Sequence, residues 1–256
     1  MDPGYLIDID GVIRIGDRPV PGAIAFLTNL QERSIPFLLV TNNSTRTQQE
    51  ISSDISRMGV DISSSSIVTS SMVAADFIAK TRRGRDVMVI GEEGLRETLS
   101  LRGMRIVDER PDHVVVGLDW SFTYDKMRRA TLAIRSGAQF IATNTDRTFP
   151  MPEGLVPGAG ALVASIEAAS GTAPIVMGKP FFPIFTRSLS LLGIDNRHVF
   201  MIGDRYDTDM AGAANAKIGS ILVTTGVNGR NDAPIDAPAP DLIVDSLLEI
   251  DPEAPL

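Results

Sequence analysis

Short apolar runs alternate with segments of helical periodicity along almost the whole chain, and this alternation restricts the fold more than any other feature. Continuous apolar runs of three to five residues are typical of strands that are buried on both faces. They occur at residues 5–7, 36–40, 87–90, 114–116, 140–142, 175–177, 199–202 and 221–223. Because such strands alternate with helices, the sequence predicts an α/β fold with a doubly wound parallel sheet.

The segments between the runs carry the period of amphipathic helices. Apolar residues of the segment 24–30 share one helical face. Further helices are predicted over 124–136 and 180–192, each followed by a glycine that can end it, with Pro180 at a position where a helix tolerates proline. A last strand is predicted over 242–244.

Composition narrows the classes of function. The 256 residues are 43% hydrophobic, enough for a substantial core. No apolar stretch approaches the ~18 to 20 residues that span a bilayer, and residues 1–4 lack the basic region of a signal peptide. We therefore expect a cytoplasmic protein without a membrane partner.

Charge and cysteine content limit the chemistry further. The formal net charge is −8, which disfavours nucleic-acid binding because the phosphate backbone rewards clustered Lys and Arg. The chain has no cysteine and two histidines, so thiolate chemistry is excluded and any metal must be held mainly by oxygen. Small anionic substrates remain compatible with local positive groups.

Two carboxylates leave the first predicted strand, at Asp8 and Asp10, and Gly11 starts a turn directly after them. Ligands of open α/β sheets bind beyond the carboxyl ends of the strands, so both acids are placed for chemistry. A carboxylate can attack a phosphoryl group whose charge a metal neutralises, and the second acid can move protons. Taken alone, the motif fits a solvated acidic turn equally well.

Short polar side chains follow the second strand, at Thr41, Asn42, Asn43 and Ser44. Hydroxyl, amide and backbone N–H donors at this edge suit phosphate oxygens. Turn formation and helix capping explain the same residues when the segment is considered by itself.

Two later strand ends bring complementary charge to the same edge. Asp204 follows the strand 199–202, where it can complete an oxygen shell for Mg²⁺ with Asp8 and the Asp10 carbonyl. Asp209 can then act on this site without binding the metal itself. Lys179 follows the strand 175–177 and supplies a compact positive charge that can pair with Asp8 and a phosphate.

Together these four segments resemble the four motifs of the haloacid dehalogenase-like (HAD) hydrolase superfamily. The resemblance covers nearly the whole chain. It implies that Asp8 is the nucleophile, Asp10 the general acid and then base, and Lys179 the charge clamp. It further implies phosphate ligands at Thr41 and at Asn42 or Asn43, and a metal ligand at Asp204 supported by Asp209.

The segment between the second and third motifs is similar to the C2-type cap of the NagD-like branch. The resemblance implies a Rossmann-like core over 1–79 and 176–256 and an inserted α/β cap over 80–175, with the active site in the crevice between them. In this branch a cap loop selects the substrate, and the matching stretch is 144–153. Substrate-binding candidates there are Asp146, Arg147, Phe149 and Met151.

We therefore expect a Mg²⁺-dependent phosphoric monoester hydrolase acting on a small phosphorylated metabolite, such as a sugar phosphate, a nucleotide, phosphoglycolate or an aryl phosphate. Relatives in this branch often dimerise through their caps, so the resemblance also implies a homodimer formed through the cap. Two alternatives stay open: a phosphotransferase or mutase that replaces water with a second acceptor, and a regulatory protein that binds a phosphometabolite without turnover. The intact pair of Asp8 and Asp10 argues against the second.

Overall fold

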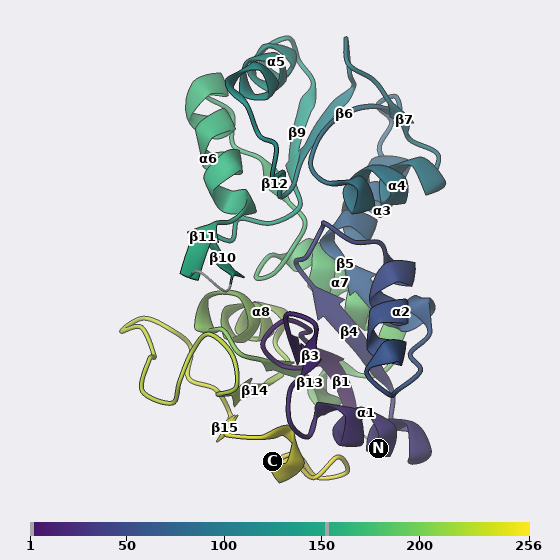
Figure 1. The fold of residues 1–256 in the computed structure, drawn as a ribbon, viewed down its shortest axis with the longest axis vertical. Helices are drawn as coiled ribbons and strands as arrows, with labels where there is room; N and C mark the ends of the chain where they lie inside the picture. Colours follow the sequence, from purple (N-terminus) through teal and green to yellow (C-terminus); the bar gives the residue numbers. More distant parts are fainter. Residues whose placement is uncertain (1–2, 152–153) are drawn as a thin grey trace. The chain divides into compact units, whose positions relative to one another are not determined.

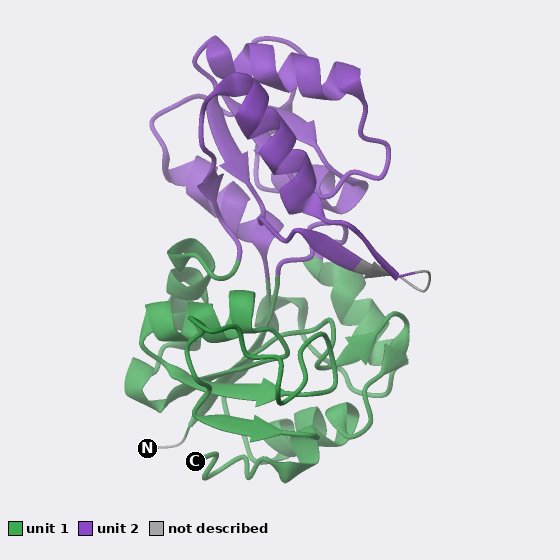
Figure 2. Cartoon of the chain, turned by 90° about the vertical axis from the view of Figure 1, so that its left-hand side faces the viewer, with its two compact units in different colours: residues 1–41, 48–68, 179–256 green, residues 42–47, 69–178 purple. Residues whose placement is uncertain are grey.

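The structure is a computed structural model that describes residues 3–151 and 154–256, and of residues 150 and 151 the backbone only. The chain divides into two compact units (Figure 2). Unit 1 contains the residues up to 41 together with 48–68 and 179–256, and unit 2 contains 42–47 and 69–178.

Unit 1 is built on a six-stranded sheet in the order β15-β14-β13-β1-β4-β5 (Figure 1). Its strands are β1 (Gly4–Ile7), β4 (Phe37–Thr41), β5 (Ile67–Thr69), β13 (Val199–Gly203), β14 (Gly219–Val223) and β15 (Leu242–Val244). The pairs β1–β4, β1–β13, β13–β14 and β14–β15 are all parallel. The predicted parallel α/β sheet is confirmed.

The order of the strands reverses between β1 and β13. From β1 the chain continues outward through β4 to β5, whereas the later strands run outward from β13 to β15 on the other side. Open α/β sheets bind their ligands beyond the carboxyl ends of the strands at such a switch point. Asp8 follows β1 and Asp204 follows β13, so both carboxylates lie at this point.

Helices surround the sheet of unit 1. They are α1 (Ala23–Glu32), α2 (Gln48–Arg57), α7 (Phe182–Leu192) and α8 (Ala211–Ala216), with a π-helical turn at Tyr206–Met210 and short 3-10 helices at Ser64–Ser66, Asn196–His198 and Leu247–Glu249. α7 packs against β4, and α8 packs against β14. The predicted helix start at Pro180 is wrong: α7 begins two residues later, at Phe182, with Phe181 as its extended N-cap and Pro183 in its first turn.

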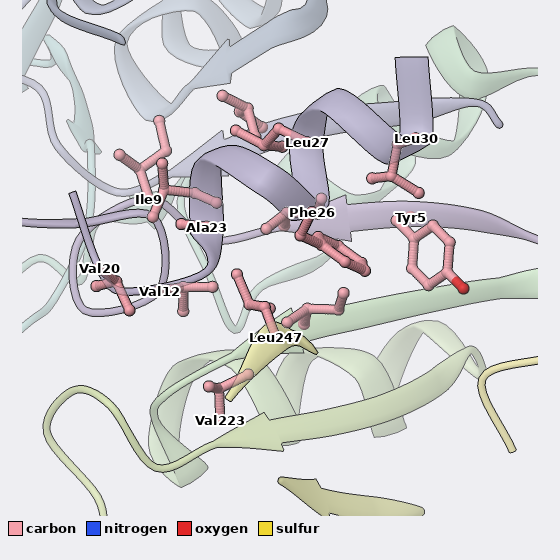
Figure 3. Close-up of a cluster of buried hydrophobic side chains, with 14 of the residues drawn as sticks. Tyr5, Ile9, Val12, Val20, Ala23, Phe26, Leu27, Leu30, Val223 and Leu247 are labelled. Carbon is pink, nitrogen blue, oxygen red and sulfur yellow. The ribbon is translucent and has the colours of Figure 1, made fainter. Parts of the chain in front are cut away.

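The core of unit 1 lies against the sheet and the loop after β1. Every residue of β1 is buried, as expected for a strand covered on both faces. Figure 3 shows part of the cluster, in which Tyr5 of β1 lies near Phe26 of α1, and Ile9 and Val12 of the loop lie near Ala23. The rings of Tyr5 and Phe26 meet edge to face with centroids 6.0 Å apart. The loop that follows Asp8 is thus anchored in the core.

A short hairpin follows this loop in unit 1. It consists of β2 (Arg14–Ile15) and β3 (Arg18–Pro19), which pair antiparallel. The sequence patterns did not predict it, because a two-residue strand carries no readable alternation of apolar and polar residues.

Unit 2 contains a second parallel sheet, in the order β12-β9-β8-β6-β7. Its strands are β6 (Asp86–Ile90), β7 (Arg105–Ile106), β8 (His113–Val116), β9 (Gln139–Ala142) and β12 (Ile175–Val176). Its helices are α3 (Ser70–Lys80), α4 (Glu93–Leu101), α5 (Tyr124–Arg135) and α6 (Ala159–Ser170). A separate antiparallel hairpin joins β10 (Thr148–Met151) to β11 (Gly154–Pro157).

The compact units divide the chain at other positions than the predicted domain boundaries. The sequence predicts an insertion over 80–175, whereas unit 2 begins its long segment at residue 69, ends it at 178 and also includes 42–47. α3 belongs to unit 2 because it packs against α4. The short segment 42–47 joins it through hydrogen bonds such as that from Ser70 Oγ to the Asn42 carbonyl, 2.9 Å.

Within the described residues, no helix combines the length and apolar character needed to cross a membrane.

Candidate functional site

A buried cluster of three carboxylates and one ammonium lies at the switch point of unit 1. Lys179 Nζ lies 2.7 Å from Asp8 Oδ1 and 2.7 Å from Asp209 Oδ1. Asp8 Oδ1 also accepts a hydrogen bond from the backbone N–H of Ile9, 2.8 Å. Asp8, Asp204 and Asp209 each offer an oxygen within 4.8 Å of the others. The structure therefore brings together four residues that the sequence places at three separate strand ends.

Backbone donors fix the orientation of the two later acids. Asp204 Oδ2 accepts from the N–H of Val227 at 2.6 Å, and Asp209 Oδ2 accepts from the N–H of Arg205 at 3.1 Å. Neither Asp204 nor Asp209 is exposed to solvent. Hydrogen bonds of this kind to the ionised form stabilise a carboxylate that burial would otherwise disfavour.

Gly11 allows the loop after β1 to approach Asp204. Its φ is +95°, a conformation that L side chains rarely adopt. A Cβ atom at this position would lie 2.4 Å from Asp204 Oδ2. A side chain at position 11 would therefore displace the carboxylate, which explains why the turn after Asp10 begins with glycine.

The pKa values in the cluster follow from burial and from mutual charge. Burial raises the pKa of Asp8 well above its usual range, although the Lys179 ammonium acts in the opposite direction. Burial, together with the neighbouring Asp209 carboxylate, raises the pKa of Asp204 to about 7. Burial by itself would lower the pKa of Lys179, but the carboxylates of Asp209 and Asp8 raise it. Lys179 consequently stays charged.

The donor set suits a hard divalent cation. When all groups are ionised, the single ammonium offsets one of the three carboxylates and two negative charges remain. Among the described side chains, Asp204 Oδ1 is a buried oxygen without a hydrogen-bond partner. Buried carboxylate oxygens of this kind are the ligands that Mg²⁺ prefers, and a divalent cation would balance the remaining charge.

The second acid of the first motif lies beside a buried arginine. Asp10 Oδ1 accepts from Arg14 Nε at 3.0 Å. The side chain of Asp10 is 36% exposed, in contrast to the buried Asp8. Asp10 is thus more accessible to water or to a bound molecule than the three buried carboxylates of the cluster.

The polar segment after β4 is divided between the units. Thr41 is buried at the end of β4 in unit 1, whereas Asn42 and Asn43 belong to unit 2. The Asn42 amide donates to both carboxylate oxygens of Asp146, at 3.1 and 3.2 Å. The structure thereby joins two of the predicted site residues that are 104 positions apart in sequence.

Asn43 is engaged within its own turn. Its side-chain oxygen accepts from the backbone N–H of Thr45 at 2.9 Å and from the Thr45 hydroxyl at 2.7 Å. This is the turn-forming role that the sequence left open for the segment. Asn42 and Asn43 therefore make different contacts, and their proposed phosphate contacts stay predictions.

The other predicted selectivity residues lie on or beside the β10–β11 hairpin of unit 2. Arg147 is exposed, and its carbonyl accepts from the N–H of Gly158 at 2.9 Å. The ring of Phe149, in β10, meets that of Trp120 edge to face with centroids 5.6 Å apart. The side chain of Met151 and residues 152–153 lie outside the described residues.

Two groups near the cluster were not predicted from the sequence. Arg14 belongs to the hairpin strand β2, and its contact with Asp10 needs the closed loop of residues 9–14. Val227 binds Asp204 through its backbone, so its side-chain type gives no sign of the contact. A glycine pair around it, Gly226 and Gly229, was the available signal of a tight loop after β14.

Two family models match the chain. A model of haloacid dehalogenase-like hydrolases matches residues 5–105, and a HAD-hydrolase-like model matches residues 176–250. A curated relative, the 5'-nucleotidase YutF of Bacillus subtilis, is 38% identical over 246 residues, which cover 96% of either chain.

Solved structures show the same similarity. NagD from Escherichia coli K-12 matches with a TM-score of 0.90 and 34% identity, over 98% of this chain and 99% of NagD. The glycerol phosphate phosphatase Rv1692 of Mycobacterium tuberculosis, solved in complex with magnesium, matches with a TM-score of 0.87 and 34% identity, over 96% of this chain and 76% of that one.

Proposed function

The chain belongs to the haloacid dehalogenase-like hydrolase family, in its NagD-like branch, and on that premise we propose that it is a Mg²⁺-dependent phosphatase of small phosphomonoesters. The observation that carries the proposal is the buried cluster in which Lys179 Nζ lies 2.7 Å from both Asp8 and Asp209. A nucleophilic carboxylate, a fixed positive charge and a metal-binding oxygen of Asp204 are the groups that phosphoryl transfer through an aspartyl-phosphate requires.

Mg²⁺ would be held by side-chain oxygens of Asp8 and Asp204 and by the main-chain carbonyl of Asp10, with Asp209 supporting the site from behind. When bound, the metal supplies positive charge that offsets the charge of the phosphate. Asp209 is better suited to the supporting role, because its two oxygens already bind Lys179 Nζ and the N–H of Arg205. Lys179 is shared between the nucleophile and this supporting acid.

The reaction would proceed in two displacements at phosphorus. In the first, a carboxylate oxygen of Asp8 forms a bond to phosphorus while the bond to the leaving oxygen breaks, and Asp10 gives its proton to that oxygen. In the second, Asp10 takes a proton from water, water oxygen bonds to phosphorus and the acyl-phosphate bond to Asp8 breaks. Inorganic phosphate leaves and both carboxylates return to their starting states.

Thr41 and Asn42 or Asn43 would donate to the phosphate oxygens, and Asp146, Arg147 and Phe149 would contact the leaving group. Arg147 is exposed and suits an anionic leaving group, whereas the Phe149 ring suits an apolar or aromatic one. The substrate classes that we propose are sugar phosphates, nucleotides, phosphoglycolate and aryl phosphates. YutF, named a nucleotidase, and Rv1692, named a glycerol phosphate phosphatase, support small phosphomonoesters.

The test is phosphate release from 4-nitrophenyl phosphate and a panel of sugar, nucleotide and glycolate phosphates, with Mg²⁺ or with EDTA. We expect turnover that requires the metal and that is lost in Asp8→Asn. Asp195→Asn, an acid-to-amide change on the surface of the same unit, is the matched control and should retain activity. Undiminished turnover in Asp8→Asn would remove Asp8 as the nucleophile, and inactivity of the wild type on the whole panel would remove the proposed function.

A further inference from the structure

Arg14 is a charged residue that is only 5% exposed, and it lies next to the acid Asp10. The loop between them is closed by backbone hydrogen bonds: the N–H of Gly11 donates to the Arg14 carbonyl at 2.8 Å, and the N–H of Arg14 donates to the Ile9 carbonyl at 3.0 Å. These bonds define the path of residues 9–14, so the guanidinium and the Asp10 carboxylate are held on the same side of the loop.

Asp54 of α2 fixes the guanidinium from its other side. Arg14 Nη1 lies 3.2 Å from Asp54 Oδ2, while Arg14 Nε lies 3.0 Å from Asp10 Oδ1. Asp54 is itself buried and also pairs with Arg57, which is exposed. A buried guanidinium is costly unless carboxylates satisfy it, and a planar group with two partners has little freedom to turn.

The ion-pair network of Asp54 and Arg14 includes Asp10, the general acid of the proposed mechanism. Asp54 and Arg14 are buried, whereas Asp10 reaches solvent at one end of the network and Arg57 at the other. A half-buried carboxylate such as that of Asp10 would sample several rotamers without such a partner. The pair with Arg14 selects one of them.

From this arrangement we propose that Arg14 is a positioning residue that orients the Asp10 carboxyl group for proton transfer to the leaving oxygen, and that Asp54 holds Arg14 in place. The inference rests on the proposed function, because it assumes that Asp10 is the general acid. A purely structural role, in which the network only attaches β2 to α2, makes a different prediction. It would lower the amount of folded enzyme and reduce turnover of every substrate by the same factor.

Substrates with different leaving groups distinguish a positioning role of Arg14 from a purely structural one. Cleavage of an alkyl phosphate would release an alkoxide unless Asp10 delivers its proton as the bond to phosphorus breaks. Cleavage of 4-nitrophenyl phosphate releases a stabilised phenolate that needs no proton in that step. Because kcat/KM reports the barrier up to the first irreversible step, misplacing Asp10 should reduce kcat/KM for the alkyl ester far more than for the aryl ester.

The experiment measures kcat/KM for glycerol phosphate and for 4-nitrophenyl phosphate in the wild type and in Arg14→Gln. We expect a fall of about 10- to 100-fold for glycerol phosphate, the size of effect that a small misplacement of a catalytic group produces, and no more than about 3-fold for the aryl ester. Arg14→Lys keeps a positive charge and should restore part of the ratio. Arg57→Gln, which removes the exposed partner of Asp54, is the control and should leave both values unchanged.

Equal losses for the two substrates, or no loss, would overturn the inference while leaving the proposed function intact. Failure of the proposed function is distinct, because the wild type itself would then release no phosphate from these two esters or from any other substrate of the panel. If Arg14→Gln does not fold, as judged by its thermal unfolding, Asp54→Asn takes its place. A selective loss on glycerol phosphate in that variant supports the inference, and an unchanged ratio of the two kcat/KM values overturns it.

Discussion

The charged cluster of unit 1 and the selectivity residues of unit 2 differ in how firmly the fold fixes them. Asp8, Lys179, Asp204 and Asp209 are buried, and each is fixed by ion pairs or backbone N–H groups at 2.6 to 3.1 Å. Arg147 is exposed, and Phe149 is half-buried on a two-stranded hairpin. Under the proposed function, this difference predicts that the reaction type depends on the buried cluster of unit 1, whereas substrate choice depends on residues of unit 2 that can vary without disturbing that cluster.

Removal of the buried ammonium should give the largest effect. Lys179→Met leaves Asp8 and Asp209 without their shared cation, so we expect kcat to fall by about 10²- to 10³-fold or more, the range seen when a fixed electrostatic donor is lost. Steady-state kinetics measures the change. Lys126→Met removes the half-buried partner of Asp119 in unit 2 and is the matched control, with kcat expected to stay within about 2-fold. Similar losses in both variants would contradict the assignment of chemistry to unit 1.

Substitutions of Asp204 and Asp209 should weaken Mg²⁺ binding to different extents. Asp204→Asn removes a proposed ligand of Mg²⁺, and Asp209→Asn removes a group that supports the site. We expect the Mg²⁺ concentration for half-maximal activity to rise by about 10- to 100-fold in Asp209→Asn and by more in Asp204→Asn. Mg²⁺ titrations of activity measure both. A larger effect in Asp209→Asn would reverse the two roles.

The free energy of unfolding of the metal-free protein should fall as the pH rises and the Asp204 carboxyl group loses its proton. The pKa of Asp204 is raised from its ordinary value to about 7, so between these two values the folded state binds more protons than the unfolded state. The free energy of unfolding therefore decreases with increasing pH across this window and levels off above about pH 7.

Thermal unfolding in EDTA, as a function of pH, measures this effect. Because other groups also titrate, the informative quantity is the difference between the wild type and Asp204→Asn, which keeps an uncharged side chain at every pH. We expect the wild type to lose stability relative to the variant between pH 5 and about pH 7, where the raised pKa lies. A relative gain over that range would show that Asp204 is not held in its neutral form by burial.

Substitutions of the predicted substrate-binding residues of unit 2 should have the smallest effects on kcat/KM, and these effects should differ between substrates. Arg147→Ala and Phe149→Ala should change the ratio of kcat/KM between phosphoglycolate, whose leaving group carries a carboxylate, and 4-nitrophenyl phosphate by about 10-fold, the order expected for one pocket contact. Arg128→Ala on the exposed face of α5 is the control. A uniform loss on all substrates would mean that these residues serve folding or catalysis instead of selection.

The same contrast explains which features could be predicted from the sequence. Asp8, Asp204 and Lys179 follow apolar runs that are readable as buried strands, and the carboxyl ends of parallel strands meet at one edge. Their convergence therefore follows from the pattern. The strand order that places Asp8 beside Asp204 is a tertiary property, and it required the structure or the family resemblance.

Features that depend on backbone geometry could not be predicted in this way. The start of α7 was placed at Pro180 because proline is common in a first helical turn, but Pro183 occupies that turn. The contact of Arg14 with Asp10 depends on a closed loop, and that of Val227 with Asp204 on a backbone N–H. Neither has a signature in residue type.

The central claim is that Asp8 carries the phosphoryl group during turnover. The most direct test is mass spectrometry of the acid-quenched enzyme in the Asp10→Asn variant, where loss of the base that activates water should let the intermediate accumulate. After reaction with 4-nitrophenyl phosphate and Mg²⁺, we expect one added phosphoryl group, located on the peptide that contains Asp8. A phosphoryl group on another residue, or rapid turnover by a variant that never becomes phosphorylated, would contradict the account.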